Sequence, residues 1–360
     1  MNQPISIMSE SGPYQVSFGD SRISELAEKL QAPVHILIDE KVQSLHEEFL
    51  KPITDGGSCI PIRAEERSKS LEALPKVVEE LARRGIRRNH ILVAIGGGII
   101  QDITAFLASC LLRGLDWVFI PTTLLAQADS CIGSKSSINC GSVKNLLGTF
   151  RPPRTIAVAP RFLLTLSNIE LMSGLGEIIK VCAIDGPETF NEIKSKYPEV
   201  LQDHELLQKF ITRALLIKKR FIELDEFDRG VRNIFNYGHS FGHAIEAATE
   251  FRIPHGVAVT IGMDMANFVA MQKNLCSPAF YEGMHSTLRM NYEPFLGETI
   301  DYKRFNEAIS RDKKNEERGQ LTLILPDAEG SILKMKIANN NEFMKSCQSF
   351  FGRDFFCQAS

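Results

Sequence analysis

The sequence predicts an α/β nucleotide-binding domain with a parallel sheet, followed by a mainly α-helical domain that binds a metal. Over the first 155 or so residues, short apolar runs alternate with amphipathic segments; from about residue 160, long helical patterns follow with few strand signals. Such alternation is typical of a parallel sheet covered by helices. The length of 360 residues also exceeds what one ordinary core holds. We expect domains 1–155 and 156–360, divided near the prolines of RPPRT (151–155).

The elements of the first domain follow from their apolar runs. VHILID (34–39) and WVFIPTT (117–123) are predicted strands, and ILVAIGGG (91–98) is a third that ends in glycines. LEALPKVVEELARRG (71–85) and IIQDITAFLASCLL (99–112) have helical spacing. Glycines between a strand and a helix let the backbone approach a diphosphate, which the free N–H groups of the helix then bind. A tight turn without a ligand is the alternative, because this is not the GxGxxG fingerprint.

Charge and composition exclude several classes of partner. A net charge of -3 provides no broad basic field for nucleic acid or an anionic membrane. The sequence contains neither a secretory leader nor the roughly eighteen uncharged apolar residues of a spanning helix. Its eight cysteines are scattered, without a CxxC pair, as expected for reduced thiols. We therefore expect a cytoplasmic protein.

Two charges stand alone in LMSGLGEIIKVCAI (171–184), namely Glu177 and Lys180. A helix here buries both, and an isolated buried charge is costly unless it is paired or binds a metal. At i,i+3 the two residues are also able to form a purely structural ion pair. The helical segment 203–224 holds a third such charge, Lys218, within an apolar stripe. Lys218 either extends past the core to solvent or reaches a ligand.

Three histidines lie close together in NYGHSFGHAIEAATEFRIPHG (236–256). Asn236, His239 and His243 are predicted to share one helical face, and His255 follows a turn at Pro254. Neutral imidazoles are common metal ligands, and HxxxH spacing brings two of them to one side of a helix. Spacing does not decide which histidines bind. A buried acid would complete a site of two histidines and one carboxylate, and Glu177 is the best candidate.

Seven segments together resemble 3-dehydroquinate synthase in order and spacing, over roughly residues 30–330. They are GGGIIQD (96–102), RG (113–114), PTTLLAQADS (121–130), KNLLG (144–148), SGLGEIIK (173–180), NYGHSFGHAIEA (236–247) and RDKK (311–314). The resemblance implies an N-terminal NAD-binding domain, a C-terminal helical metal domain, an active site in the cleft between them and a homodimer.

The resemblance also implies roles for individual residues. The ligands of a divalent metal, zinc or alternatively cobalt, are Glu177, His239 and His255. The NAD contacts are Asp39, Glu66, Lys69, Gly97, Gly98, Asp102, Thr122 and Thr123. The substrate pocket is lined by Asp129, Lys135, Lys144, Asn145, Lys180, Lys218, Arg232, Asn236 and His243, with one or both of Lys313 and Lys314. Arg113 is expected to bind substrate phosphate from the neighbouring subunit.

The implied reaction converts 3-deoxy-D-arabino-heptulosonate 7-phosphate to 3-dehydroquinate and phosphate in the shikimate pathway of aromatic amino acid biosynthesis. Bound NAD oxidises one alcohol, phosphate is eliminated, the carbonyl is reduced again, and ring opening with an aldol closure forms the carbocycle. NAD is thus a recycled catalyst. The enzyme is accordingly a carbon–oxygen lyase.

Several positions depart from the usual pattern of this family. Cys140-Gly141-Ser142-Val143 stands where His-Pro-Leu-Gly is common, Ser134 and Gln101 replace glycines, and Val257 replaces a glutamate. These changes leave open a cyclase acting on another sugar phosphate, such as sedoheptulose 7-phosphate. Two further alternatives are a metal- and NAD-dependent polyol dehydrogenase and a non-catalytic protein of the same fold. The lysine-rich pocket disfavours the first, and the charges in apolar helices disfavour the second.

Overall fold

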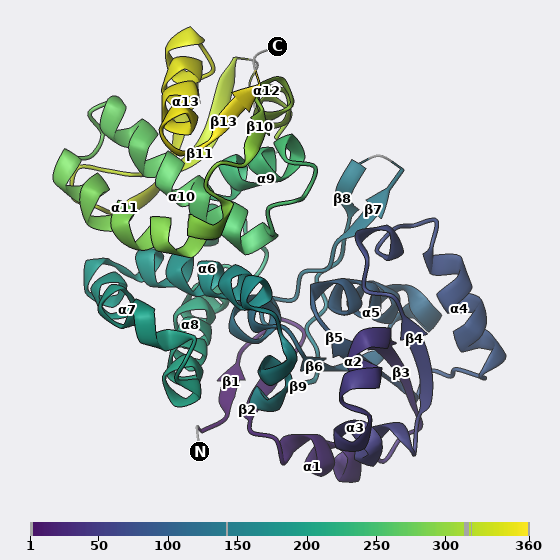
Figure 1. Ribbon diagram of the computed structural model, residues 1–360. Coiled ribbons are helices and arrows are strands. Elements are labelled where there is room, and N and C mark those ends of the chain that lie inside the picture. The colour runs from purple at the N-terminus through teal and green to yellow at the C-terminus, as the bar shows by residue number, and fades with distance from the viewer. Residues whose placement is uncertain (1–2, 142, 313–316, 318, 359–360) are drawn as a thin grey trace. The chain divides into compact units, whose positions relative to one another are not determined.

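The computed structural model describes residues 3–141, 143–312, 317 and 319–358. Its contacts divide the chain into two compact units, which Figure 1 labels by element. Unit 1 is Met1–Ser167 with Ile211–Phe227, and unit 2 is Asn168–Phe210 with Asp228–Ser360. The domain boundary near residue 155 stays a prediction. The contacts group residues 156–167 and 211–227 with the first unit.

Unit 1 is built on a seven-stranded sheet of order β1-β2-β9-β6-β5-β3-β4. The strands are β1 (Ile5–Ile7), β2 (Tyr14–Phe18), β3 (Val34–Asp39), β4 (Ser58–Ile62), β5 (Ile91–Gly96), β6 (Asp116–Pro121) and β9 (Thr155–Val158). All neighbouring pairs are parallel except β1 and β2. Every residue of β5 is buried, as expected for a central parallel strand covered on both faces. The predicted strands at 34–39, 91–98 and 117–123 are confirmed as β3, β5 and β6, although β5 and β6 end two residues earlier than predicted.

Helices bury the two faces of this sheet. The helices along this part of the chain are α1 (Arg22–Lys29), α2 (Glu40–Leu45), α3 (Glu47–Thr54), α4 (Leu74–Arg83) and α5 (Gly98–Cys110). Ile36, Ile38, Val93 and Ile95 alternate along β3 and β5, and they pack in one cluster with residues of α1 and α3. α5 packs against β5 and β6.

Shorter elements connect the sheet to the predicted site residues. They are the 3-10 helices η1 (Glu66–Ser68), η2 (Leu111–Arg113) and η4 (Pro160–Thr165), the π-helix η3 (Ala126–Ser130), and the hairpin of β7 (Ile138–Cys140) and β8 (Val143–Leu147). The π-helix widens one turn, a rare geometry that is frequent at functional sites. It contains Asp129.

Unit 2 is mainly helical, as predicted. Its helices are α6 (Asn168–Asp185), α7 (Pro187–Val200), α8 (His204–Leu224, which belongs to unit 1 from Ile211 onward), η5 (Val231–Asn236), α9 (His239–Ala248), α10 (His255–Gln272), α11 (Pro278–Tyr292), η6 (Glu293–Phe295), α12 (Tyr302–Ser310) and α13 (Asn341–Asp354). Two small sheets pair β10 (Thr299–Asp301) with β13 (Phe356–Gln358) and β11 (Gln320–Pro326) with β12 (Ile332–Ala338). α10 is the central helix and packs against α6, α9 and α11. Within the described part of the chain, no helix has the length and apolar character needed to span a membrane.

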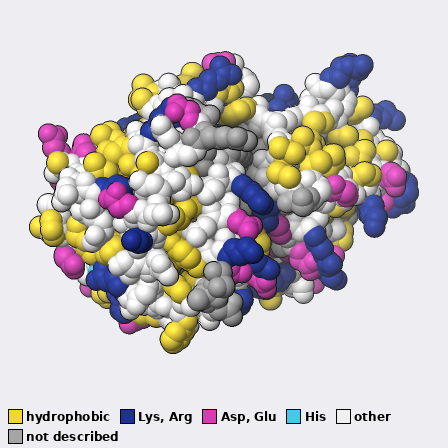
Figure 2. Space-filling view, turned by 90° about the horizontal axis from the view of Figure 1, so that it is seen from above, with side chains coloured by type: hydrophobic (Ala, Val, Ile, Leu, Met, Phe, Trp, Pro, Cys, Tyr) yellow, Lys and Arg dark blue, Asp and Glu magenta, His cyan; other side chains and the backbone are white. Residues whose placement is uncertain are grey.

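The outer surface carries charges of both signs. On the face seen in Figure 2, Lys and Arg side chains are interspersed with Asp and Glu, and hydrophobic side chains gather in separate patches. This distribution agrees with the small net charge of -3. Anion recognition therefore has to come from local groups.

Candidate functional site

The charge pair predicted in α6 is buried in unit 2. Glu177 and Lys180 are 1% and 2% exposed, and Lys180 Nζ lies 2.5 Å from Glu177 Oε2. The ammonium also lies 5.7 Å from the centre of the Phe235 ring, within range of a cation–π contact. The structural ion pair that the sequence left open is thus present. It uses only one oxygen of the carboxylate.

The other oxygen of Glu177 faces two histidines. Oε1 lies 3.4 Å from His255 Nε2 and 3.9 Å from His239 Nε2. This oxygen is buried and accepts no hydrogen bond from any residue that the structure describes. A buried carboxylate oxygen without a donor is costly, and two imidazole nitrogens beside it are the ligand set that zinc prefers. The residues therefore fit a divalent metal.

Each histidine is oriented by its second ring nitrogen. His239 Nδ1 lies 3.3 Å from the carbonyl oxygen of Tyr237, and His255 Nδ1 lies 3.2 Å from Glu246 Oε2. Such contacts fix the tautomer of a metal-binding imidazole and leave Nε2 for the metal.

Glu246 is a residue that the sequence reasoning missed. It follows His239 by seven residues and His243 by three, so it shares their face of α9, and that spacing was the available signal. Glu246, His243 and His255 form a second group whose ligand atoms lie within 4.8 Å of one another, as do those of Glu177, His239 and His255. The group of His243, Glu246 and His255 is more exposed than the group around Glu177. Its Glu246 already accepts a hydrogen bond from His255. This difference favours the group around Glu177.

Close helix contacts place these ligands. A Cβ added to Gly256 would lie 1.8 Å from the carbonyl oxygen of Ser173, and one added to Gly176 would lie 2.2 Å from that of Gly256. α6 and α10 therefore touch through their backbones at the point where Glu177 and His255 face each other. His255 is the first residue of α10. Its position depends on this contact.

Protonation of the group follows from its burial and charges. Burial would raise the pKa of Glu177, but the Lys180 charge and the nearby His255 imidazole hold it well below its usual value. Burial would lower the pKa of His255, but the neighbouring carboxylates of Glu177 and Glu246 raise it to about 10. Without a metal, the imidazole is therefore charged at neutral pH and the carboxylate is ionised.

The prediction that Asn236 shares a helical face with His239 and His243 is wrong. α9 begins at His239, and Gly238 before it has a left-handed backbone with φ 76°. Asn236 instead ends the 3-10 helix η5, in which Arg232 is 4% exposed. The glycine turn breaks the helical spacing that the sequence pattern assumed.

In unit 1, the predicted NAD contacts gather at the carboxyl ends of neighbouring strands. Asp39 ends β3, Gly97 and Gly98 follow β5, and Thr122 and Thr123 follow β6. The chain passes from β3 to β4 on one side and returns to β5 on the other, so the order reverses between β3 and β5. Parallel α/β sheets bind nucleotides at such a switch point.

Local details of this edge fit a nucleotide. A Cβ at Gly97 would lie 2.9 Å from Thr123 Cγ2, whereas one at Gly98 would meet no described heavy atom within 4 Å. Thr122 is 2% exposed, and its hydroxyl has no hydrogen-bond partner among the described residues. Burial raises the pKa of the Asp39 carboxyl. At this edge a diphosphate is able to approach the backbone at Gly98 and the N-terminus of α5. The polar groups of Asp39 and Thr122 are available to a ribose.

A hydrogen-bond network joins the other predicted NAD contacts to the β7–β8 hairpin. Lys69 Nζ lies 2.9 Å from both Asp102 Oδ2 and Asn145 Oδ1. Asp102 also accepts from the Ser137 amide at 3.0 Å and hydroxyl at 2.8 Å. Burial raises the pKa of Asp102, and the contacts with Lys69 and Ser137 oppose that rise. Predicted cofactor and substrate residues thus meet in one network.

The remaining predicted residues of this unit lie on several separate segments. Lys218 Nζ lies 2.7 Å from both the carbonyl oxygen and Oδ1 of Asp129. Lys144 Nζ lies 3.7 Å from Glu66 Oε1, and Lys135 is exposed. Arg113 and Asn145 have left-handed backbones with φ 70° and 53°. Such conformations are costly for residues with a side chain and often occur at functional sites.

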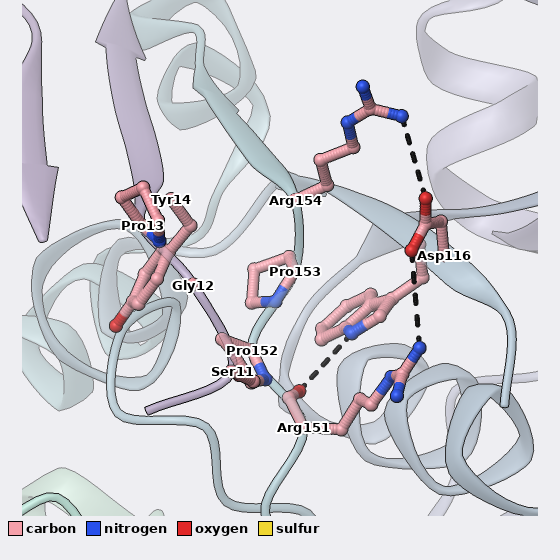
Figure 3. A pocket seen from close by; sticks show the side chains of 10 residues that line it. Ser11, Gly12, Pro13, Tyr14, Asp116, Arg151, Pro152, Pro153 and Arg154 are labelled. Atoms are coloured by element: carbon pink, nitrogen blue, oxygen red, sulfur yellow. Dashed lines mark hydrogen bonds and ion pairs between the residues drawn. The ribbon is translucent and has the colours of Figure 1, made fainter. Parts of the chain in front are cut away.

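Two predicted residues, Lys313 and Lys314, lie outside the described residues. A cavity of about 220 Å³ in unit 1 is lined by Tyr14, Asp116, Trp117, Arg151 and Arg154 among others. Figure 3 shows both arginines directed toward Asp116, at 4.0 and 3.5 Å. None of the predicted site residues lines this cavity. Its arginines are already paired, so we assign it no part in the site.

Models of two protein families match the chain consecutively. The 3-dehydroquinate synthase N-terminal model matches residues 59–173, and the 3-dehydroquinate synthase C-terminal model matches residues 174–315. The 3-dehydroquinate synthase of Clostridium tetani is 35% identical over 329 residues, which is 89% of this chain and 86% of that protein. The 3-dehydroquinate synthase of Dictyoglomus thermophilum is 37% identical over 316 residues, covering 87% of this chain and 88% of that protein.

A solved structure has the same fold over nearly the whole chain. The 2-epi-5-epi-valiolone synthase of Streptomyces hygroscopicus subsp. jinggangensis, with NAD+ and Zn2+ bound, superposes with a TM-score of 0.86 at 27% identity. The match covers 97% of this chain and 99% of that one. The predicted α/β and helical architecture is thereby confirmed.

Proposed function

The chain belongs to the 3-dehydroquinate synthase family, and from this premise we propose that it converts 3-deoxy-D-arabino-heptulosonate 7-phosphate to 3-dehydroquinate and phosphate. The observation that carries the proposal is the Glu177 carboxylate, whose two oxygens face Lys180 and a pair of histidines. A buried carboxylate with one oxygen facing an ammonium and the other facing two imidazoles is able to bind a metal in an enzyme. In a protein that binds no metal, burial of the second oxygen would only lower stability.

Glu177, His239 and His255 hold the metal, and zinc is the metal that their donor atoms suit best. NAD binds at the carboxyl edge of the sheet, with its diphosphate at Gly97, Gly98 and the start of α5. When bound, the metal polarises the oxygen that is oxidised and NAD supplies a hydride acceptor that is restored within each turnover.

The protein's own side chains bind and orient the substrate. Lys180 is held by Glu177, and Lys218 is held by Asp129, so both ammonium groups are fixed in position. Arg232 presents a planar guanidinium, which matches the geometry of a carboxylate better than lysine does. Lys144 and Asn145 in the hairpin, with Lys135, Asn236 and His243, provide the other polar contacts.

The presence of a carboxylate partner decides between substrates. The buried guanidinium of Arg232, 4% exposed, matches the planar carboxylate of the heptulosonate, a group that sedoheptulose 7-phosphate lacks. The curated relatives described above are also 3-dehydroquinate synthases. Both points favour the heptulosonate.

Three finer assignments belong to the same proposal. The enzyme acts in the shikimate pathway, it forms a homodimer in which Arg113 serves the neighbouring subunit, and it works in the cytoplasm. All eight cysteines lie among the described residues and are free thiols. Free thiols are typical of a reducing compartment.

Phosphate release with each sugar phosphate tests the proposed substrate. Purified protein with NAD and zinc is incubated with either the heptulosonate or sedoheptulose 7-phosphate, and inorganic phosphate is measured. We expect turnover with the heptulosonate. Release from sedoheptulose 7-phosphate alone would refute the substrate, and a matched His239→Ala variant controls for phosphatase contamination.

A further inference from the structure

A buried glutamine in α5 is bonded to the residue that follows Asp129. Gln101 is 6% exposed. Its Nε2 donates to the carbonyl oxygen of Ser130 at 2.6 Å, and its Oε1 accepts from the Ser130 hydroxyl at 2.6 Å. One side-chain amide therefore holds one residue by two hydrogen bonds, which restrict rotation as well as displacement.

Lys218 holds the same segment from another helix. Its ammonium lies 2.7 Å from the carbonyl oxygen and from Oδ1 of Asp129. Residues 129 and 130 end the π-helix η3, so their backbone is fixed by side chains from α5 and from the part of α8 that belongs to unit 1. A shift of this peptide would move the Asp129 carboxylate and the Lys218 ammonium together.

The two hydrogen bonds to Ser130 require a polar side chain at position 101. A glycine there, as in the family pattern described above, has no group to bond Ser130. We propose that Gln101 is a positioning residue that sets the place of Asp129 and Lys218 for the substrate. This inference rests on the proposed function, because it is there that Asp129 and Lys218 line the substrate pocket.

The test removes the two hydrogen bonds while keeping the volume. Gln101→Met has a similar length and no polar atoms. The matched control is Thr104→Val, which removes the hydrogen bond from the buried Thr104 hydroxyl to the Ile100 carbonyl in the same helix. Steady-state kinetics, the Kd for NAD and the melting temperature are measured for both variants.

We expect Gln101→Met to lower kcat/KM for the heptulosonate about tenfold, because small misplacements of substrate-binding groups are costly to turnover. The Kd for NAD should stay within about twofold of that of the unaltered protein, and Thr104→Val should leave kcat/KM unchanged. A role in stability alone would lower the melting temperature of Gln101→Met and leave kcat/KM intact. That result would overturn the proposal.

A second variant makes the hydrogen bond pH-dependent. In Gln101→Glu, the introduced carboxyl donates to the Ser130 carbonyl only when protonated, and burial favours that form. Its kcat/KM relative to the unaltered protein should therefore approach one at low pH and fall as the pH rises. A ratio that does not change with pH would contradict the proposed hydrogen bond.

A measurement without substrate separates this inference from the proposed function. Amide hydrogen exchange of a peptide spanning residues 126–131 should be faster in Gln101→Met than in the unaltered protein and Thr104→Val. If the unaltered protein releases no phosphate, the proposed function is refuted. The amide exchange rates still measure whether the Gln101 side chain restrains residues 126–131. An unchanged exchange rate in Gln101→Met would refute the proposal that Gln101 restrains this segment.

Discussion

Individual residues of the metal group serve two purposes at once. Glu177 balances the buried ammonium of Lys180 through Oε2 and faces His239 and His255 through Oε1. Because the carboxylate stays ionised, it is able to pair with Lys180 and to bind a metal at the same time. The stability of unit 2 and its affinity for metal are therefore linked at one side chain, and they can be separated by substitution.

His239→Ala should abolish metal binding with little loss of stability. The imidazole is a ligand, but its removal leaves the ion pair of Glu177 and Lys180 intact. Metal content after gel filtration, measured by atomic emission, should fall from about one ion per chain to near zero, and turnover should be lost with it. A variant that retains full activity without metal would refute the assignment.

Glu177→Gln should remove both the metal and a large part of the stability. Lys180 would remain buried without its counter-charge, which costs roughly 3–5 kcal/mol. The double variant Glu177→Gln/Lys180→Met should regain most of the free energy of unfolding but not the metal. Glu188→Gln, an exposed acid in α7, is the control. Equal stability of the single and double variants in urea titrations would contradict the linkage.

Metal binding should release a proton from His255 at neutral pH. Against the opposing effect of burial, the neighbouring carboxylates of Glu177 and Glu246 raise its pKa to about 10, and a metal binds only the neutral imidazole. Affinity should therefore increase with pH and level off above about 10. In the metal-free protein, the same pKa rise stabilises the fold fully below pH about 6.5, and this contribution is lost as the pH rises through about 10.

Calorimetric titration of the metal-free protein in buffers of different ionisation enthalpy measures this release. The apparent binding heat should vary linearly with the buffer's ionisation enthalpy, with a slope of about one proton near pH 7. A heat that is the same in every buffer would show that His255 is already neutral.

The sequence predicted the chemistry of these residues better than their geometry. Burial of Glu177 and Lys180 followed from the apolar residues around them, because a helix of such residues has no polar face. His255 was beyond reach of spacing alone, since a turn separates it from α9. Asn236 was misplaced because Gly238 stops the helix, and Glu246 was missed because an acid on a half-exposed helix looks like an ordinary solvated charge.

Among the elements, α10 organises the metal group by its contacts with α6 and α9. Gly256 meets the Ser173 carbonyl, and Gly262 meets the Gly238 carbonyl, where added Cβ atoms would lie at 1.8 and 2.1 Å. Side chains would hold these helices farther apart. The small residues thus set the spacing at which His239, Glu177 and His255 converge.

Gly256→Ala should separate α6 from α10 and weaken the metal site. The added methyl cannot be accommodated against backbone without movement, so we expect a loss of stability of at least about 1–3 kcal/mol and a lower metal affinity. Gly283→Ala in α11 is the control, because no described heavy atom outside its own stretch of helix lies within 4 Å of the added Cβ. There alanine should be neutral or stabilising by up to about 1 kcal/mol. Thermal unfolding and metal titration distinguish the two, and unchanged metal affinity in Gly256→Ala would contradict the spacing argument.

Elements buried on both faces were predictable, and elements held by side chains were not. β3, β5 and β6 are continuous apolar runs because helices cover both faces of the sheet. The β7–β8 hairpin mixes polar and apolar residues, and its position depends on hydrogen bonds from Lys69 to Asn145 and Ser137. Likewise, the apolar stripe of α8 predicts that the helix is buried but not which element covers it. The grouping of Ile211–Phe227 with unit 1 was therefore not predictable from the sequence.

For the whole molecule, the residues proposed for the reaction are divided between the two units. The NAD contacts, Asp129 and Lys218 belong to unit 1, and the metal group with Arg232 belongs to unit 2. A dehydrogenase would accumulate reduced cofactor, whereas the proposed cyclisation oxidises and then reduces the same substrate. The fate of the nicotinamide is therefore the feature that separates the two classes of enzyme.

The most direct test follows phosphate release and NADH together, with the heptulosonate in large excess over enzyme-bound NAD. The proposed function predicts many phosphates released per NAD and no net rise in NADH absorbance. Net NADH formed in proportion to substrate consumed, without phosphate release, would contradict it.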